Sequence, residues 1–202
     1  MTSISLITFW ILFGLGHSIL ASQSVKRKLQ SSGMQASRYR FIYNFVAIFC
    51  LLPIMWIHWF DQSISLFSLP FGFKFLSGLF AIKGLFITAF AFKNYDLRSF
   101  LGLKEEESKP ILNTSGMNEI MRHPLYTGTM MIAVGICFLK PQLNIFISAF
   151  CVILYIAIGT MFEERKLIAQ FGEEYNEYKK KVPRFIPIPG DLIGWIFRSR
   201  KP

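Results

Sequence analysis

Two short polar segments carry the residue types that could do chemistry in this chain. Residues 122–128 read Arg-His-Pro-Leu-Tyr-Thr-Gly, and the pair Glu163-Glu164 is followed by a second polar stretch at 171–175. Each segment adjoins the end of a long apolar run. Ionisable side chains at the mouth of a membrane bundle are energetically costly unless they bind something there. The two segments therefore predict a binding or catalytic site.

The residue types suit a ligand that is part nucleoside and part cationic amino acid. His123 offers an imidazole, Tyr126 an aromatic face, and Gly128 a gap that a ligand or a neighbouring helix can approach closely. Glu163 and Glu164 are carboxylates near a predicted helix C-terminus, where a ligand ammonium or sulfonium would compensate their unfavourable interaction with the helix dipole. Taken singly, these residues also fit a helix end rising into water and ordinary interfacial side chains.

Composition points to a membrane protein. The chain has 202 residues, of which 52% are hydrophobic, and a net charge of +10. This predicts an all-α polytopic membrane protein, a bundle of about five transmembrane helices. Because the basic residues cluster at the ends of apolar runs, they indicate a cytoplasmic face in contact with anionic lipid, and no nucleic-acid partner is expected. The three cysteines lie inside apolar runs without metal-ligand spacing, so no metal site is expected.

Five apolar segments approach the ~20 residues that cross a bilayer. They span residues 4–21, 41–60, 73–92, 125–139 and 143–162. Pro124 is expected at the start of the fourth helix, where its missing N–H leaves no hydrogen bond unmade. Residues 173–182 have helical spacing with Tyr175, Tyr178 and Val182 on one side, which predicts an amphipathic helix on the cytoplasmic surface.

Loop charge predicts the orientation and the organisation of the chain. The first and third connections and the C-terminal tail are basic, so we expect them in the cytoplasm, with the N-terminus outside the cell membrane. Residues 1–202 are expected to form one membrane domain: 1–92 the first three helices, 93–124 a cytoplasmic connection, and 122–185 the ligand-binding helix hairpin with its surface helix. Because a short turn joins the last two helices, the two polar segments should be neighbours.

The C-terminal half resembles a known family. Residues 122–128 match the R-H-P-x-Y-x-G signature of the integral-membrane methyltransferases, and residues 163–167, 171–175 and 178–183 are similar to the C-terminal signature of that family. It includes the isoprenylcysteine carboxyl methyltransferases and the phospholipid methyltransferases. Two motifs in order at the spacing of a helix hairpin make the resemblance specific over about the last 90 residues.

The N-terminal half resembles the bacterial methanethiol S-methyltransferases. The similar stretches are Gly-His-Ser-Ile-Leu-Ala at 16–21, Val-Lys-Arg at 25–27, Arg-Tyr-Arg at 38–40, Tyr-Asp-Leu at 95–97 and Leu-Gly-Leu at 101–103. This likeness favours a thiol acceptor.

The resemblance implies a methyltransferase that uses S-adenosyl-L-methionine (SAM), bound at the cytoplasmic end of the last two helices. By motif, His123, Pro124, Leu125 and Tyr126 should line the cofactor pocket, and Glu163 should face the α-amino group of SAM. These roles are chemically reasonable, because a carboxylate pairs with an ammonium and an aromatic face attracts a sulfonium.

One departure bears on the acceptor. The isoprenylcysteine enzymes carry an arginine four residues before the matching glutamate, thought to hold the acceptor carboxylate, and here that position is Gly159. Arg122 or Arg165 could substitute. The difference favours a small thiol or lipophilic acceptor over a prenylcysteine or a phospholipid headgroup, since methyl transfer to a thiolate needs orientation and desolvation more than a strong base.

Three ionisable residues are candidates for a catalytic role: His17, Lys83 and Arg122. Lys83 lies near the middle of the third predicted helix, where a lysine snorkels, pairs inside the bundle or contacts the acceptor. His17 is a packed, hydrogen-bonded histidine, a base or an acceptor contact.

Two other functions stay open. The chain could be a non-catalytic binding or assembly module on the same fold, as the glycine at position 159 suggests. It could also be a reductase, because sterol reductases share this C-terminal architecture. The acceptor, the oligomeric state, the pathway and any lid motion of residues 93–121 are not determined by the sequence.

Overall fold

A computed structural model describes residues 2–60, 63–93, 98, 101–103 and 111–190 of the protein. Apart from one isolated β-bridge between Ser65 and Gln142, the regular structure within these residues is helical. The helices are α1 (Thr2–Leu20), α2 (Gln23–Ser31), α3 (Ala36–Phe60), α4 (Phe71–Lys93), the 3₁₀ helix η1 (Gly116–Glu119), α6 (Pro124–Leu139), α7 (Leu143–Phe171) and α8 (Glu173–Lys181).

Four of these helices, α1, α3, α4 and α7, are long and apolar enough to cross a membrane. The remaining predicted span, α6, is apolar but has only 16 residues. Large hydrophobic side chains cover the outward faces of the bundle, including Trp59 (84% exposed) and Phe71 (82%). Such faces are stable against lipid and not against water. The predicted all-α polytopic membrane fold is confirmed.

The structure corrects the predicted end of the last long helix. α7 continues to Phe171, well past residue 162 where its apolar run stops. The residues beyond that point include Glu, Arg, Lys, Leu and Ala, which all favour helix, so the helix continues after the apolar run has ended. Glu163 and Glu164 therefore lie inside a helix, and the interpretation of this pair as a helix end is wrong.

Two further elements differ from the expectation. α3 begins at Ala36, before the predicted start at residue 41. The short helix α2 was not predicted from the sequence, because it is polar and lies between apolar runs. Ser22 caps it by accepting a hydrogen bond from the Val25 N–H at 3.4 Å.

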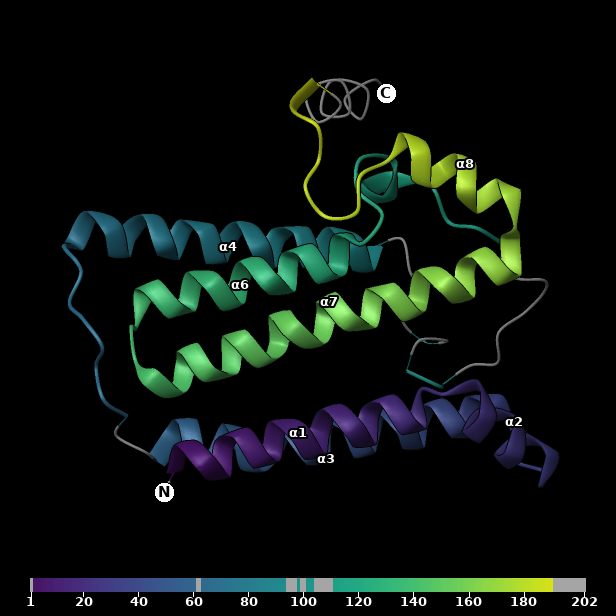
Figure 1. Ribbon diagram of the computed structural model, residues 1–202, viewed down its shortest axis with the longest axis horizontal. Helices are drawn as coiled ribbons and strands as arrows, with labels where there is room; N and C mark the ends of the chain where they lie inside the picture. The colour runs from purple at the N-terminus through teal and green to yellow at the C-terminus, as the bar shows by residue number, and fades with distance from the viewer. Residues whose placement is uncertain (1, 61–62, 94–97, 99–100, 104–110, 191–202) are drawn as a thin grey trace.

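The helices form two groups that share α7. Figure 1 shows α4, α6 and α7 side by side, with α1 and α3 running along the other side of α7. Leu6, Ile54 and Ile57 are buried between α1 and α3, and Ile147 of α7 packs against them. This arrangement brings the start of α6 and the C-terminal part of α7 to the same end of the bundle.

The α4–α6 contact is unusually close, and glycines make it possible. A Cβ atom on Gly128 would lie 2.6 Å from the carbonyl oxygen of Gly84, and closer still to Thr88 Oγ1. A Cβ on Gly84 would in turn lie 2.7 Å from the carbonyl oxygen of Gly128. Of the two roles left open for Gly128, the structure supports the neighbouring helix. Backbone-to-backbone packing of this kind is common where helices associate in membranes.

The C-terminal segment folds back onto the start of α6. α8 follows Gly172, whose φ of +58° makes the sharp turn. The predicted amphipathic helix is present, and Tyr175 and Val182 are buried on its inner side. Beyond it, the chain passes beside α6 (Figure 1), where the Arg122 N–H donates to the Pro183 carbonyl at 2.9 Å and the His123 N–H donates to the Arg184 carbonyl at 3.1 Å.

Candidate cofactor site

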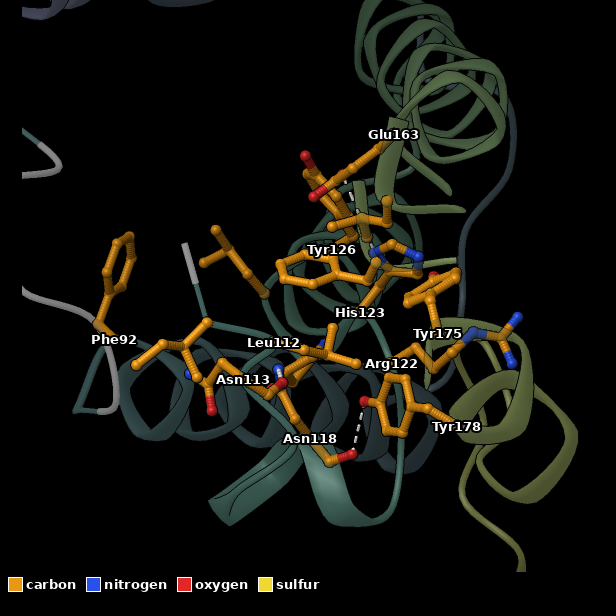
Figure 2. A pocket seen from close by; sticks show the side chains of 15 residues that line it. Phe92, Leu112, Asn113, Asn118, Arg122, His123, Tyr126, Glu163, Tyr175 and Tyr178 are labelled. Carbon is orange, nitrogen blue, oxygen red and sulfur yellow. Dashed lines mark hydrogen bonds and ion pairs between the residues drawn. The ribbon is translucent and has the colours of Figure 1, made fainter. Parts of the chain in front are cut away.

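The two polar segments meet at a cavity of about 290 Å³, close to the lower limit of small-molecule pockets. Figure 2 shows His123 and Tyr126 in its wall, with Glu163 on one side of them and Tyr178 on the other. The wall is built from the end of α4, the segment around η1, the start of α6, the C-terminal part of α7, and α8. It includes all five residues expected from the sequence to bind a cofactor: His123, Pro124, Leu125, Tyr126 and Glu163.

His123 is the residue immediately before α6, and its side chain is 4% exposed. Pro124 occupies the first helical position, as predicted. The imidazole packs beside Tyr126 and Phe185, with ring centroids 5.6 and 6.0 Å away. Burial lowers the pKa of His123 below its ordinary value, although the neighbouring carboxylates of Glu163 and Glu164 act in the opposite direction. We therefore treat this imidazole as neutral at pH 7.

The adjacent glutamates have different surroundings, because neighbouring residues point about 100° apart around a helix. The Glu163 side chain is 43% exposed and lines the cavity. Glu164 is buried, with only 3% exposure. Its carboxylate accepts hydrogen bonds from Arg122 at 2.8 and 3.0 Å and from Arg184 at 2.6 and 3.2 Å. Glu164 is thus a compensated buried charge, and Glu163 is the carboxylate that a ligand can reach.

Arg122, one of the three catalytic candidates, is tied into this cluster. Its guanidinium is 7% exposed and, besides Glu164, donates to the carbonyl oxygens of Lys179 and Val182. These bonds join the start of α6 to the end of α8. A catalytic role for Arg122 stays a prediction, whereas its part in holding the cavity wall is a feature of the fold.

Sequence reasoning did not identify several residues of the wall. Asn113, Asn118, Tyr175 and Tyr178 line the cavity, and the Tyr178 hydroxyl donates to the Asn118 carbonyl at 2.7 Å. The spacing of Tyr175 and Tyr178 predicted one side of an amphipathic helix. Tyr175 also lies in the polar stretch 171–175, but neither tyrosine was assigned to a ligand. The asparagines lie in a segment that reads only as a turn.

Tyr175 is a deeply buried residue of the cavity wall. The residue is 1% exposed. Within the described part of the chain its hydroxyl oxygen makes no hydrogen bond of ordinary geometry, but the Arg122 guanidinium is close enough to act on its pKa in the lowering direction. Burial raises the pKa of Tyr175 to about 12, so the hydroxyl stays protonated at pH 7. The hydroxyl oxygen is itself buried and lies in the field of Arg122 and Glu164, so it belongs to this charged cluster and is not open to a ligand.

The other two catalytic candidates do not line the cavity. His17 lies where α1, α3 and α7 meet, hydrogen-bonded through Nε2 to the Tyr43 hydroxyl and packed against Phe13 and Tyr155. Lys83 is on the exposed face of α4. Of the stretches that resemble the methanethiol enzymes, residues 95–97 lie outside the described part of the chain.

Comparison with known proteins places these features in context. The chain is 26% identical over 195 residues to a methanethiol S-methyltransferase of Crocosphaera subtropica (strain ATCC 51142 / BH68), covering 89% of this chain and 72% of the relative. It is 27% identical over 190 residues to the Pseudomonas deceptionensis methanethiol S-methyltransferase, covering 87% and 69%. Over 98 residues it is 37% identical to protein-S-isoprenylcysteine O-methyltransferase B of Arabidopsis thaliana, covering 45% of this chain and 47% of that protein. No solved structure matches the chain.

The apolar helices and these relatives define the class of the protein, an integral-membrane methyltransferase. The chain belongs to the NnrU protein family, whose sequence profile matches residues 5–197. The resemblance predicted from the sequence is confirmed. A methyltransferase requires a methyl donor and an acceptor.

Proposed function

We propose that this protein transfers a methyl group from SAM to a small or lipophilic thiol. The observation that carries the proposal is the convergence of His123, Pro124, Leu125, Tyr126 and Glu163 on one cavity. The resemblance assigns these same residues to SAM from sequence motifs alone.

The cavity wall offers groups that fit the parts of SAM. Glu163 provides a reachable negative charge for the ammonium group, and the Tyr126 ring provides an aromatic face for the sulfonium. When bound, SAM supplies an electrophilic methyl group. Leu125, Leu167 and other apolar residues of the wall exclude water, which favours reaction with a thiolate by removing its hydration shell.

A thiol is our first choice of acceptor. Similarity to the methanethiol S-methyltransferases extends over most of this chain, whereas similarity to the isoprenylcysteine enzyme covers less than half. Gly159 faces open space among the described residues, since none of their atoms lies within 4 Å of a Cβ built there. The place where an acceptor-binding arginine would begin is therefore not filled by a described neighbour. A prenylcysteine or phospholipid acceptor is the alternative.

The proposed orientation puts this cavity on the cytoplasmic side of the cell membrane. SAM then enters from the cytosol and the acceptor arrives through the bilayer. Residues 122–185 act in this scheme as the cofactor-binding unit of a single membrane domain.

The direct test is a transfer assay with protein purified in detergent. Incubation with methyl-labelled SAM and a panel of alkanethiols, a prenylated cysteine and phosphatidylethanolamine should yield labelled thioether from the thiols. Label found only in the methyl ester of the prenylated cysteine, or only in the lipid, would show that the acceptor is a prenylcysteine or a phospholipid and not a thiol. Well-folded protein that binds SAM but labels none of them would favour a binding module, and NADPH binding in place of SAM binding would favour a reductase.

Replacing Tyr175 with phenylalanine tests whether its buried hydroxyl takes part in ligand binding. Because the hydroxyl makes no hydrogen bond of ordinary geometry among the described residues, its removal should change unfolding stability by less than about 0.5 kcal/mol. SAM affinity should stay within about twofold, because the hydroxyl oxygen is buried and not open to the ligand. Thermal unfolding with and without SAM measures both quantities. A marked loss of stability without ligand would show that the hydroxyl is structural.

A further inference from the structure

The imidazole of His123 lies between the carboxylates of Glu163 and Glu164, at different distances from each. Its Nε2 atom is 3.2 Å from Glu164 Oε1, a hydrogen-bond distance. Its Nδ1 atom is 3.9 Å from Glu163 Oε2, which is too long for a hydrogen bond. One ring nitrogen is therefore occupied and the other faces the reachable carboxylate.

The surroundings of Glu164 determine which nitrogen carries the proton. An ionised carboxylate only accepts hydrogen bonds, so the Nε2 atom of a neutral His123 must be the donor toward it. Arg122 and Arg184 keep Glu164 ionised by donating to both of its oxygens. With the proton on Nε2, the Nδ1 atom presents a lone pair, because the two ring nitrogens of a neutral histidine have opposite roles.

Two acceptors then face each other across a short gap. The Nδ1 lone pair and the Glu163 carboxylate, 3.9 Å apart, repel unless a donor lies between them. A single nitrogen can lie about 2.8–2.9 Å from both atoms at once. An ammonium group has three N–H donors and a positive charge, so it can donate to both acceptors and remove the repulsion.

Arg184 links this arrangement to the C-terminal segment. Its side chain binds Glu164 through Nη2 at 2.6 Å and Nε at 3.2 Å. Its backbone carbonyl accepts from the His123 N–H at 3.1 Å. The residue therefore touches His123 directly through the backbone and indirectly through Glu164. Its own side chain is 36% exposed and does not line the cavity.

We infer that Glu164 and Arg184 are positioning residues that hold His123 with its proton on Nε2, so that Nδ1 and Glu163 together form a subsite for the ammonium group of the ligand. This inference rests on the proposed function, because it specifies how the SAM amino group is recognised. Neither Glu164 nor Arg184 touches the ligand in this scheme.

The test compares two ligands that differ only in the ammonium group: S-adenosylhomocysteine and its desamino analogue. Isothermal titration of the detergent-purified protein should show that the wild type prefers S-adenosylhomocysteine. Arg184→Met and Glu164→Gln should reduce that preference by about 10- to 100-fold, the contribution of one hydrogen bond to a charged group. Both variants should bind the desamino analogue about as well as the wild type. Lys180→Met is the control, because it also removes a positive charge, but from an α8 side chain that is 67% exposed and does not line the cavity, so both affinities should stay unchanged.

Binding of the desamino analogue also reports that the variants are folded. If Arg184→Met binds neither ligand, the milder variant Arg184→Lys provides the test. Lysine keeps the positive charge but not the paired hydrogen bonds, so its preference for S-adenosylhomocysteine over the desamino analogue should lie between those of the wild type and Glu164→Gln. An unchanged preference in variants that bind both ligands overturns the inference, as does an equal loss for both ligands in Arg184→Lys. Wild-type protein that binds neither ligand contradicts the proposed function itself, and the inference with it.

Discussion

Glu163→Gln is expected to raise the dissociation constant for SAM by about 10- to 100-fold, because a charged hydrogen bond contributes about 1.5–3 kcal/mol. The reason is that Glu163 is the half-exposed carboxylate of the cavity, whereas Glu164 is already neutralised by two arginines. Glutamine keeps the shape of the side chain and removes the charge that attracts an ammonium. Isothermal titration with purified protein in detergent measures the change.

Glu173→Gln is the matched control for this substitution. Glu173 begins α8, its side chain is 75% exposed, and it does not line the cavity. Its replacement should leave SAM affinity within about twofold, as expected for a substitution at an exposed site. If Glu163→Gln binds SAM as tightly as the wild type, the assignment of Glu163 to the ammonium group is wrong.

Gly128→Ala is expected to have the largest effect on stability, a loss of about 3 kcal/mol from overpacking. The added Cβ would lie 2.6 Å from the Gly84 carbonyl oxygen and 2.9 Å from the Thr88 backbone nitrogen, both backbone atoms that cannot move without separating α4 from α6. Because Gly128 is one turn into α6, this separation would also displace His123 and Tyr126. We expect a lower midpoint of thermal unfolding in detergent, and weaker SAM binding in the protein that remains folded.

Gly159→Ala is the control, because it makes the same chemical change in a helix where no atom of the described residues lies within 4 Å of the new Cβ. Alanine favours helix over glycine by up to about 1 kcal/mol, so this variant should be as stable as the wild type or more stable. Equal unfolding midpoints for the two alanine variants would refute the close α4–α6 contact.

The membrane fold could be predicted from the sequence because its causes are local. A run of apolar residues long enough to cross a bilayer must form a helix, since every backbone group has to bond within the segment. All five predicted spans are helices in the structure, and Pro124 begins α6 as expected. The error at the end of α7 has the same origin, because hydropathy reports where lipid ends and not where the helix ends.

The candidate site could be predicted in part. The hairpin of α6 and α7 brings the two polar segments together, and the short turn between the helices already implied this. The difference between Glu163 and Glu164 was not accessible, because two adjacent glutamates are chemically identical until the partners of each are known. Those partners include Arg184, which lies 20 positions from Glu164 and reaches it only after α8 folds back.

By itself, the sequence determined the class of the protein and its five apolar helices, and it supplied the candidate residues for a cofactor site, because each depends on composition, short-range spacing or a contiguous motif. Only the tertiary structure decided that Gly128 serves the contact with α4, that Glu164 is a buried ion pair while Glu163 is open to a ligand, and that Tyr175 and Arg184 belong to the surroundings of the site. These features depend on which distant side chains share a small volume. Burial and pairing of charge are properties of that volume, and no single segment of the chain contains them.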